Sequence, residues 1–158
     1  MEIILIILIG CLLILGVVEF RIHSSNVSKI PIRIHVNGSR GKSSVVRLIA
    51  SGLRTGGLKA VGKTTGTSPR IIDEHGNDKY IHRLRSASIG EQISLIRRFS
   101  KLNLDALVIE CMAVHPQYQW ISEHKIVKST IGVLTNVRPD HLDEMGISID
   151  QIAKSMGN

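Results

Sequence analysis

The chain begins with a continuous hydrophobic segment. Residues 3–18 are sixteen positions without a charge, most of them Ile or Leu. As an α-helix this stretch extends about 24 Å, slightly less than the hydrocarbon core of a bilayer at about 30 Å. Phe20 lengthens the apolar stretch, and Glu2 and Glu19 extend toward the interfaces. The pattern predicts a transmembrane anchor over residues 1–20.

A cleavable signal peptide is the alternative for this segment. Such peptides usually carry positive charge before the apolar core and a small-x-small cleavage site after it. This chain has Glu2 at its start and no such site, and basic residues follow the apolar stretch at Arg21, Lys29 and Arg33. By the positive-inside tendency, we expect a single-pass cell-membrane protein whose later residues form a cytoplasmic domain.

Beyond the anchor, hydrophobic positions alternate between the strand and helix periods, after a polar linker expected at residues 21–30. Strands are expected at 31–36, 59–62, 106–109 and 130–134, the last two apolar enough for a buried parallel sheet. Helices are expected at 42–55, 88–99 and 148–156. The charged residues 69–86 are expected to form a surface excursion. This alternation predicts an α/β fold with a doubly wound, mostly parallel sheet over residues 31–158.

The chain is basic, with a formal net charge of +7 and a pI near 9.8. Nucleic acid, an anionic membrane surface or a polyanionic substrate would each suit that charge. Aromatic residues make up only 3% of the chain, which disfavours stacking on single-stranded nucleic acid. We therefore expect no nucleic-acid partner. The two cysteines, Cys11 in the apolar segment and Cys111 after a strand, are not expected to form a disulfide.

The strongest chemical signal lies between the first expected strand and the first expected helix. Glycines there allow backbone N–H groups to converge on phosphate oxygens, and a helix N-terminus adds a favourable dipole. Lys42 can reach the β- and γ-phosphates of ATP, and Ser43 can hold Mg²⁺. Because Val36 stands where the strict nucleotide loop has glycine, this is the shorter Gly-x-x-Gly-Lys-Ser form, and an ordinary glycine-rich turn is the alternative. The expected ATP-binding residues are Gly38, Ser39, Arg40, Gly41, Lys42, Ser43 and Ser44.

Two further signals also follow expected strands. Glu110 comes directly after residues 106–109, and ligands of open α/β sheets gather at the carboxyl ends of strands. A carboxylate there can coordinate the Mg²⁺ that bridges nucleotide phosphates, although a strand-end acid alone is more often simply solvated. The segment that begins at Asn136 holds His141 between Asp140 and Asp143, which could bind a second Mg²⁺ or orient the transferring phosphate.

Weaker signals complete the set. The hydroxyls of Thr65 and Thr67, with Gly66 between them, could line the γ-phosphate, although such loops are common turns. Glu91 and Gln151 match the helix capping box, and we assign both to capping.

These motifs, in this order, resemble the ATPase domain of the Mur ligase superfamily. Within it, the chain is most similar to the poly-γ-glutamate synthase catalytic subunits of the CapB/PgsB type, which also have an N-terminal hydrophobic helix. The similarity covers nearly the whole chain, and Glu-Cys-Met-Ala at 110–113 is its most specific part. The segments that carry it are 36–43, 63–67 with Arg70, 89–92, 110–119 and 136–146.

The resemblance implies an ATP-dependent amide ligase that activates a terminal carboxylate as an acyl phosphate and adds glutamate to poly-γ-glutamate. It implies Lys42 at the β,γ-phosphates, Ser43 and Glu110 on a first Mg²⁺, and His141 near a second cation. Asn136 is included among the ATP-binding residues, and Thr65 and Thr67 would lie close to the transferred group. Membrane lipid and other membrane subunits of a synthase complex are the partners it implies.

Two departures from the family bear on the activity. Mur ligases often use a modified lysine after the Asp-His motif, and only Lys154 lies near that position, at a different spacing. Relatives also continue with further strands and a C-terminal domain, so we expect a fragment, a split gene product or a truncated reading frame. The alternative function is a membrane-anchored nucleotide-binding regulatory subunit, or an inactive fragment, without ligase activity.

Overall fold

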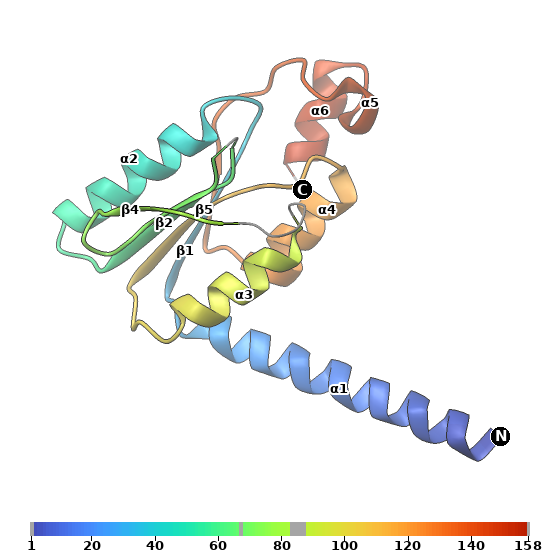
Figure 1. The fold of residues 1–158 in the computed structure, drawn as a ribbon. Coiled ribbons are helices and arrows are strands. Elements are labelled where there is room, and N and C mark those ends of the chain that lie inside the picture. The colour runs from blue at the N-terminus through green and yellow to red at the C-terminus, as the bar shows by residue number, and fades with distance from the viewer. Residues whose placement is uncertain (1, 67, 83–87, 158) are drawn as a thin grey trace.

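The computed structural model describes residues 2–66, 68–82 and 88–157, which form an α/β domain preceded by a long helix (Figure 1). The strands are β1 (Ile32–Asn37), β2 (Ala60–Thr64), β3 (Arg70–Ile72), β4 (Asp78–Tyr80), β5 (Ala106–Glu110) and β6 (Ile131–Leu134). The helices are α1 (Glu2–Ser28), α2 (Lys42–Thr55), α3 (Gly90–Phe99), α4 (Pro116–Ile121), α5 (Leu142–Met145) and α6 (Ile149–Met156). A π-helical segment, η1 (Ser122–Val127), continues α4.

The strands form one sheet in the order β4-β3-β2-β5-β1-β6. The strands β2, β5, β1 and β6 are parallel neighbours, whereas β3 and β4 add an antiparallel hairpin at one edge. The mostly parallel α/β sheet expected from the alternation of strands and helices is confirmed. Because the four parallel strands run the same way, the segments that follow them begin at one edge of the sheet.

Helix α2 covers one face of the sheet, as Figure 1 shows. Val46 and Ala50 of α2 are fully buried against Val36 of β1 and Val108 of β5. Gly62 of β2 lets the helix approach closely, because a Cβ at that position would lie 3.2 Å from the Ala50 Cβ. This contact fixes the start of α2 beside the ends of β1 and β5.

The other face is covered by α3, η1 and the last turns of α1. Phe99 of α3, Ile126 of η1 and Val27 of α1 pack in one buried cluster with Leu107 and Ile109 of β5. Burial of such side chains contributes about 1.5–3 kcal/mol each. The C-terminal end of α1 therefore belongs to the core of the domain, whereas its first part is exposed and extends away from the domain (Figure 1).

The polar linker expected before the first strand is wrong for residues 21–28, which continue helix α1. Tertiary contacts hold this polar stretch in the helix. The His23 Nε2 lies 2.9 Å from the Ile126 carbonyl oxygen, and Lys128 Nζ donates to Ser24 Oγ at 2.9 Å. Ile30, just beyond the helix, is fully buried.

The surface excursion expected at residues 69–86 contains the β3–β4 hairpin, whose two short strands were not predicted and whose β4 is exposed. The Asp73 carboxylate accepts hydrogen bonds from the His75 and Asn77 amides, and Gly76 adopts a φ of +87°. These features make a tight turn between two strands of only three residues. Residues 83–87 lie outside the described residues.

Strand β6 is parallel, as expected, but it is not buried. Ile131 and Leu134 are 49% and 47% exposed, because β6 pairs only with β1 and lies at the edge of the sheet in the described part of the chain. Its apolar sequence correctly predicted a strand and wrongly predicted its burial.

Candidate functional site

The segments after β1, β2, β5 and β6 meet at one cavity of about 280 Å³. Lys42, Glu110 and His141, which come from three different strand–helix connections, all line it. The other lining residues are Asn37, Gly38, Ser39, Arg40, Thr65, Gly66, Cys111, Met112, Ala113, Val114, Asp140, Met145 and Met156. Most residues singled out in the sequence therefore lie around one space at the carboxyl edge of the parallel strands.

The glycine-rich loop between β1 and α2 depends on two glycines with positive φ. Gly38 has a φ of +131°, and a Cβ there would lie 2.1 Å from Thr135 Oγ1. Gly41 has a φ of +81° and precedes α2 without a side-chain cap. The first-turn amides of α2 therefore have no capping side chain at Gly41, which is an arrangement suited to an anion.

The Lys42 ammonium lies over this loop. Its Nζ donates to the carbonyl oxygen of Gly38 at 2.6 Å and more weakly to that of Ser39 at 3.5 Å. The cation is thus held beside the cavity by two neutral acceptors, which cost little to exchange for a phosphate oxygen.

Glu110 joins the glycine-rich loop to the segment after β2. Its Oε2 accepts a 2.7 Å hydrogen bond from Ser43 Oγ and a 2.8 Å bond from the Thr65 amide. Glu110 is only 4% exposed. A buried carboxylate requires such donors, because an unpaired charge away from water is costly. One acidic group therefore organises both loops.

The donor set here fits Mg²⁺. The Ser43 hydroxyl and the Glu110 carboxylate are hard oxygen donors, and Mg²⁺ is usually held by one or two carboxylates together with phosphate oxygens and water. Within the described residues, no three His, Cys, Asp or Glu side chains are grouped to hold a metal without other ligands.

The loop after β6 supports the glycine-rich loop from behind. The Oγ of the buried Ser39 donates to the Arg138 carbonyl at 3.0 Å and accepts from the Arg138 amide at 2.9 Å. Asn136 uses its Oδ1 to accept from the Arg40 amide and its Nδ2 to donate to the Arg40 carbonyl. Thr135 Oγ1 donates to the same carbonyl. Asn136 contacts the loop backbone and is not among the described residues that line the cavity.

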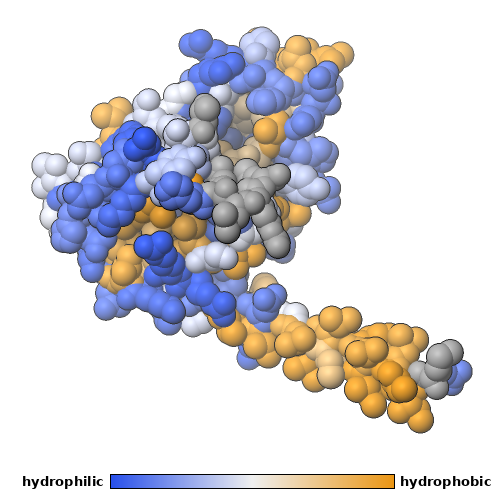
Figure 2. Space-filling model, viewed as in Figure 1, coloured by the Kyte–Doolittle hydropathy of each residue, from blue (hydrophilic) through white to orange (hydrophobic). Residues whose placement is uncertain are grey.

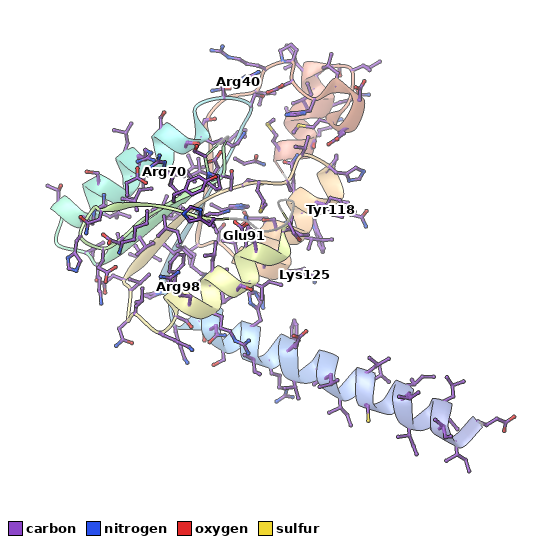
Figure 3. The ribbon with its side chains drawn as sticks, in the orientation of Figure 1. Arg40, Arg70, Glu91, Arg98, Tyr118 and Lys125 are labelled. Carbon is purple, nitrogen blue, oxygen red and sulfur yellow. The ribbon has the colours of Figure 1, made fainter. Side chains whose placement is uncertain are left out.

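The Asp140–His141 pair also lines the cavity. His141 has a φ of +48°, which is uncommon for a residue other than glycine, and its side chain is 53% exposed. Its Nε2 is 3.9 Å from Asp140 Oδ1. The other Asp140 oxygen, Oδ2, lies 3.5 Å from the Arg40 guanidinium, which Figure 3 labels above the loop. Strain at His141 marks this position as a candidate for function.

A buried ion pair lies next to the Thr65 loop. Lys63 on β2 is completely buried, and its Nζ is 3.2 Å from Oε1 of Glu91 at the start of α3. The assignment of Glu91 to helix capping was therefore wrong, because its carboxylate pairs with Lys63. Glu91 lies near the centre of the domain in Figure 3. The pair ties the end of β2 to α3.

Gln151 does cap a helix, as expected. Ser148 Oγ accepts from the Gln151 amide at 3.3 Å, and Gln151 Oε1 accepts from the Ile147 amide at 2.9 Å. A standard capping box would use the amide of the N-cap residue, Ser148, whereas the Gln151 side chain accepts from the amide of Ile147, one residue earlier.

A second charge pair joins the buried His35 of β1 to the partly buried Glu123 of η1. His35 Nδ1 is 2.5 Å from Glu123 Oε2, and His35 is 3% exposed. Burial lowers the pKa of His35, but polar contacts with the Cys111 thiol and with Glu123 outweigh it and raise the pKa to about 9. Burial likewise raises the pKa of Glu123, and hydrogen bonds from His35 and Ser129 outweigh it and lower the pKa below 4.5. The pair carries opposite charges at neutral pH.

Thr67, which was expected beside the γ-phosphate from the sequence, lies outside the described residues. Three residues that shape the site were assigned no role from the sequence. Asn37 Oδ1 accepts from the Gly38 amide at 2.8 Å, and its Nδ2 donates to Gln119 Oε1 at 2.7 Å. Thr135 and Lys63 are the others. A lysine at the end of an apolar strand, Lys63, was a detectable signal, because a charge there must find a buried partner.

The chain matches known proteins over most of its length. The Mur ligase middle domain family matches residues 36–158. Capsule biosynthesis protein CapB of Bacillus anthracis is 43% identical over 148 residues, which cover 91% of this chain and 32% of that protein. PGA synthase CapB of Bacillus subtilis (strain 168) is 42% identical over 153 residues, which cover 96% of this chain and 39% of that protein. The chain thus spans about a third of the length of these relatives.

Solved structures show the same fold at low sequence identity. E. coli FolC in complex with DHPP and ADP matches with a TM-score of 0.60 at 17% identity, over 87% of this chain and 37% of that one. The G51S mutant of L. casei FPGS matches with a TM-score of 0.55 at 20% identity, over 87% of this chain and 40% of that one.

Proposed function

The chain belongs to the Mur ligase family through its middle domain, and we propose that it is the ATP-binding part of an ATP-dependent amide ligase. The observation that carries the proposal is the buried Glu110 carboxylate, which bonds both Ser43 and Thr65 beside the glycine-rich loop. A regulatory phosphate loop has no need of a buried carboxylate and of the Asp140–His141 pair on the same cavity.

Poly-γ-glutamate is the product that we propose. Two relatives at 43% and 42% identity are named a capsule biosynthesis protein and a PGA synthase. The net charge of +7 suits a polymer that carries one carboxylate on every residue. The substrates would be ATP, glutamate and the growing poly-γ-glutamate chain.

The proposed reaction has two steps. A terminal carboxylate oxygen attacks the γ-phosphorus of ATP, the bond to the β,γ-bridging oxygen breaks, and an acyl phosphate and ADP form. The deprotonated amine of glutamate then attacks the acyl carbon, an amide bond forms, and phosphate leaves. Neither step requires the protein to form a covalent bond, so its contribution is positioning and the stabilisation of negative charge.

The candidate residues named from the sequence have distinct roles in this proposal. Lys42 would exchange its carbonyl partners for the β- and γ-phosphate oxygens. Ser43 and Glu110 would hold Mg²⁺, which neutralises charge on the phosphates when bound. His141, with Asp140, would help hold a second cation near the acyl phosphate. Thr65 and Thr67 would lie beside the transferred group, and Gly66 would allow its close approach.

We also propose that α1 anchors this domain to the cell membrane. Helix α1 is 27 residues long and apolar enough to cross a bilayer, and none of its most apolar window is buried. Figure 2 shows a hydrophobic surface along the part of α1 that extends from the domain. In this arrangement the helix is a single span, the ATP-binding domain is cytoplasmic, and lipids and other membrane subunits are neighbours.

The test is glutamate-dependent release of ADP by the complete ligase that contains this segment. With ATP, Mg²⁺ and glutamate, we expect ADP, phosphate and γ-linked polymer in the wild type and none of them in Lys42→Ala. ATP binding without glutamate-dependent ADP release would instead support the regulatory subunit.

A further inference from the structure

We propose that a groove between α1, α3 and η1 binds one anionic phospholipid at the base of the anchor. The proposal goes beyond the ligase activity, but it rests on the proposed anchoring of α1 in a membrane. It assigns a role to a surface that shares no lining residue with the nucleotide cavity.

The groove has a volume of about 540 Å³ and a largely apolar floor. Phe20 contributes from α1, Ile93 from α3, and Ile121 and Ile126 from the α4–η1 segment. Phe20 and Ile93 remain 59% and 41% exposed. Figure 2 shows that the apolar surface of α1 reaches the point where the helix meets the domain. The floor is therefore continuous with the hydrophobic surface of the anchor.

The position of the groove along α1 matches the edge of a bilayer. Its α1 residues run from Gly16 to Asn26, whereas the uncharged part of the helix ends at Val18. With a helical rise of about 1.5 Å per residue, the groove extends about 15 Å from within the apolar span into the polar region. That interval holds the headgroups and first acyl carbons of the adjacent leaflet.

Cations surround the polar end of the groove. Arg97 and Lys125 line it, and Lys128 Nζ lies 5.2 Å from the centre of the Phe20 ring. Lys128 is held there by a 2.9 Å hydrogen bond to Ser24 Oγ. Glu19 is the opposing carboxylate among the described lining residues. Two lining cations, with Lys128 beside Phe20, against one lining carboxylate favour a ligand with net negative charge.

A phospholipid matches a groove with both an apolar floor and a cationic end better than a transmembrane helix does. Its phosphate would contact the cationic end, and its acyl carbons would cover the apolar floor beside α1. A partner helix would cover the apolar floor but would leave Arg97 and Lys125 without anionic partners in a poorly hydrated region. Neutral phospholipids carry no net charge to balance the cations, so we expect an anionic headgroup such as phosphatidylglycerol.

The test uses the 158-residue chain in neutral detergent, titrated with short-chain phosphatidylglycerol or phosphatidylcholine. Trp120 is the single tryptophan, and Lys125 Nζ lies 5.2 Å from its ring, so its emission should report occupancy of the groove. The variants are compared by the lipid concentration at the midpoint of the titration, because replacing Lys125 also changes the intensity of the Trp120 emission directly. Native mass spectrometry, which counts retained lipids, gives an independent readout.

The decisive comparison is between two double variants that remove the same charge. Arg97→Gln with Lys125→Gln should raise the phosphatidylglycerol midpoint about tenfold or more, because two cations that each favour an anionic surface by a few-fold are lost. Arg98→Gln with Lys101→Gln, outside the groove lining, should leave it nearly unchanged. Figure 3 labels Lys125 and Arg98 on either side of α3.

Three results would overturn the proposal: equal midpoints for the two lipids, an equal loss in both double variants, or no saturable binding of either lipid. The second would indicate diffuse surface charge, and the third would leave the groove to a helix of another subunit. ATP binding, measured on the same preparations, should be the same in all three proteins. If the wild type bound no ATP, the proposed function would be contradicted, but the lipid titrations would still test the lipid site.

Discussion

Ser43 Oγ donates a 2.7 Å hydrogen bond to Glu110 Oε2 and thereby joins the first turn of α2 to the end of β5. The same carboxylate oxygen accepts the Thr65 amide at 2.8 Å. Three connections far apart in the sequence are therefore held at one buried oxygen. This contact gives the proposed Mg²⁺ site its shape before any nucleotide arrives, which reduces the cost of organising it.

Replacement of Glu110 tests that site. Glu110→Gln keeps an oxygen that can accept from Ser43 and Thr65 but removes the negative charge that attracts Mg²⁺. We expect Mg²⁺-dependent ATP binding, measured by titration calorimetry, to weaken at least about tenfold. Glu74→Gln, which removes the same charge in the β3–β4 turn, is the matched control and should bind like the wild type. Equal affinity in Glu110→Gln and the wild type would refute a metal-binding role.

The two glycines of the loop give a second comparison. Gly38→Ala would place a Cβ 2.1 Å from Thr135 Oγ1 at a φ that side chains rarely adopt, so we expect a displaced loop and no measurable ATP binding. Gly41→Ala meets no atom within 4 Å and should cost only the strain of a left-handed residue, about 1–2 kcal/mol. Denaturation curves and ATP titrations of both variants check this order. A Gly38→Ala protein that binds ATP better than Gly41→Ala would contradict it.

The main elements of the fold could be predicted from the sequence because local patterns determine them. Helix α2 begins and ends at the expected residues, since helical spacing and the glycines on both sides fix its limits. The hairpin was missed because β3 and β4 have three residues each and depend on the Asp73 turn and on edge pairing with β2. Residues 21–28 were misjudged because their helix is stabilised by contacts with η1 and with Lys128 directly after it, about 100 residues later.

The residues of the candidate site could also be predicted from local motifs, whereas their long-range contacts could not. Glycine, lysine and strand-end acid signals are local, and the structure brings Lys42, Glu110 and His141 to one cavity. The partner of Glu91 was not predictable, because no local pattern specifies a contact with Lys63 on a strand 28 positions earlier. The brace between Ser39 and Arg138 uses backbone groups, which the residue type does not reveal.

The Lys63–Glu91 pair should be sensitive to loss of one partner. Glu91→Gln removes the carboxylate that lies 3.2 Å from the fully buried Lys63 ammonium, and we expect the free energy of unfolding to fall by about 3 kcal/mol. The double variant Lys63→Met with Glu91→Leu should recover most of this loss, because an apolar pair of similar size is often neutral there. Urea denaturation, followed by Trp120 emission, measures both.

A control for that pair is Asp78→Asn, which removes a partly exposed partner of Arg47 and Arg70 and should cost less than about 1 kcal/mol. If Glu91→Gln proved no more destabilising than Asp78→Asn, the buried pair would not contribute as described.

Stability should fall at alkaline pH through His35. Its pKa is about 9 in the folded chain and 6.5 as an ordinary value, so the charged histidine contributes its full stability below 6.5. That contribution is lost as the pH rises from 6.5 through about 9. Glu123, whose pKa is lowered from 4.5, contributes above that value and loses its contribution as the pH falls through its folded pKa.

Urea midpoints measured across this range should therefore be highest between pH 4.5 and 6.5 and should decline toward pH 9. His35→Gln should be less stable at low pH and should lack most of the alkaline decline. An identical pH profile in the variant and the wild type would show that His35 is not the titrating group.

ATP binding by the Lys42→Ala variant tests the central claim most directly, because the claim requires the glycine-rich loop to hold the nucleotide phosphates. Titration calorimetry with ATP and Mg²⁺ compares the wild type, Lys42→Ala and Lys154→Ala, which removes a lysine that does not line the cavity. We predict saturable binding for the wild type and for Lys154→Ala, and a loss of at least about a hundredfold for Lys42→Ala. Binding of equal strength in Lys42→Ala would contradict the account.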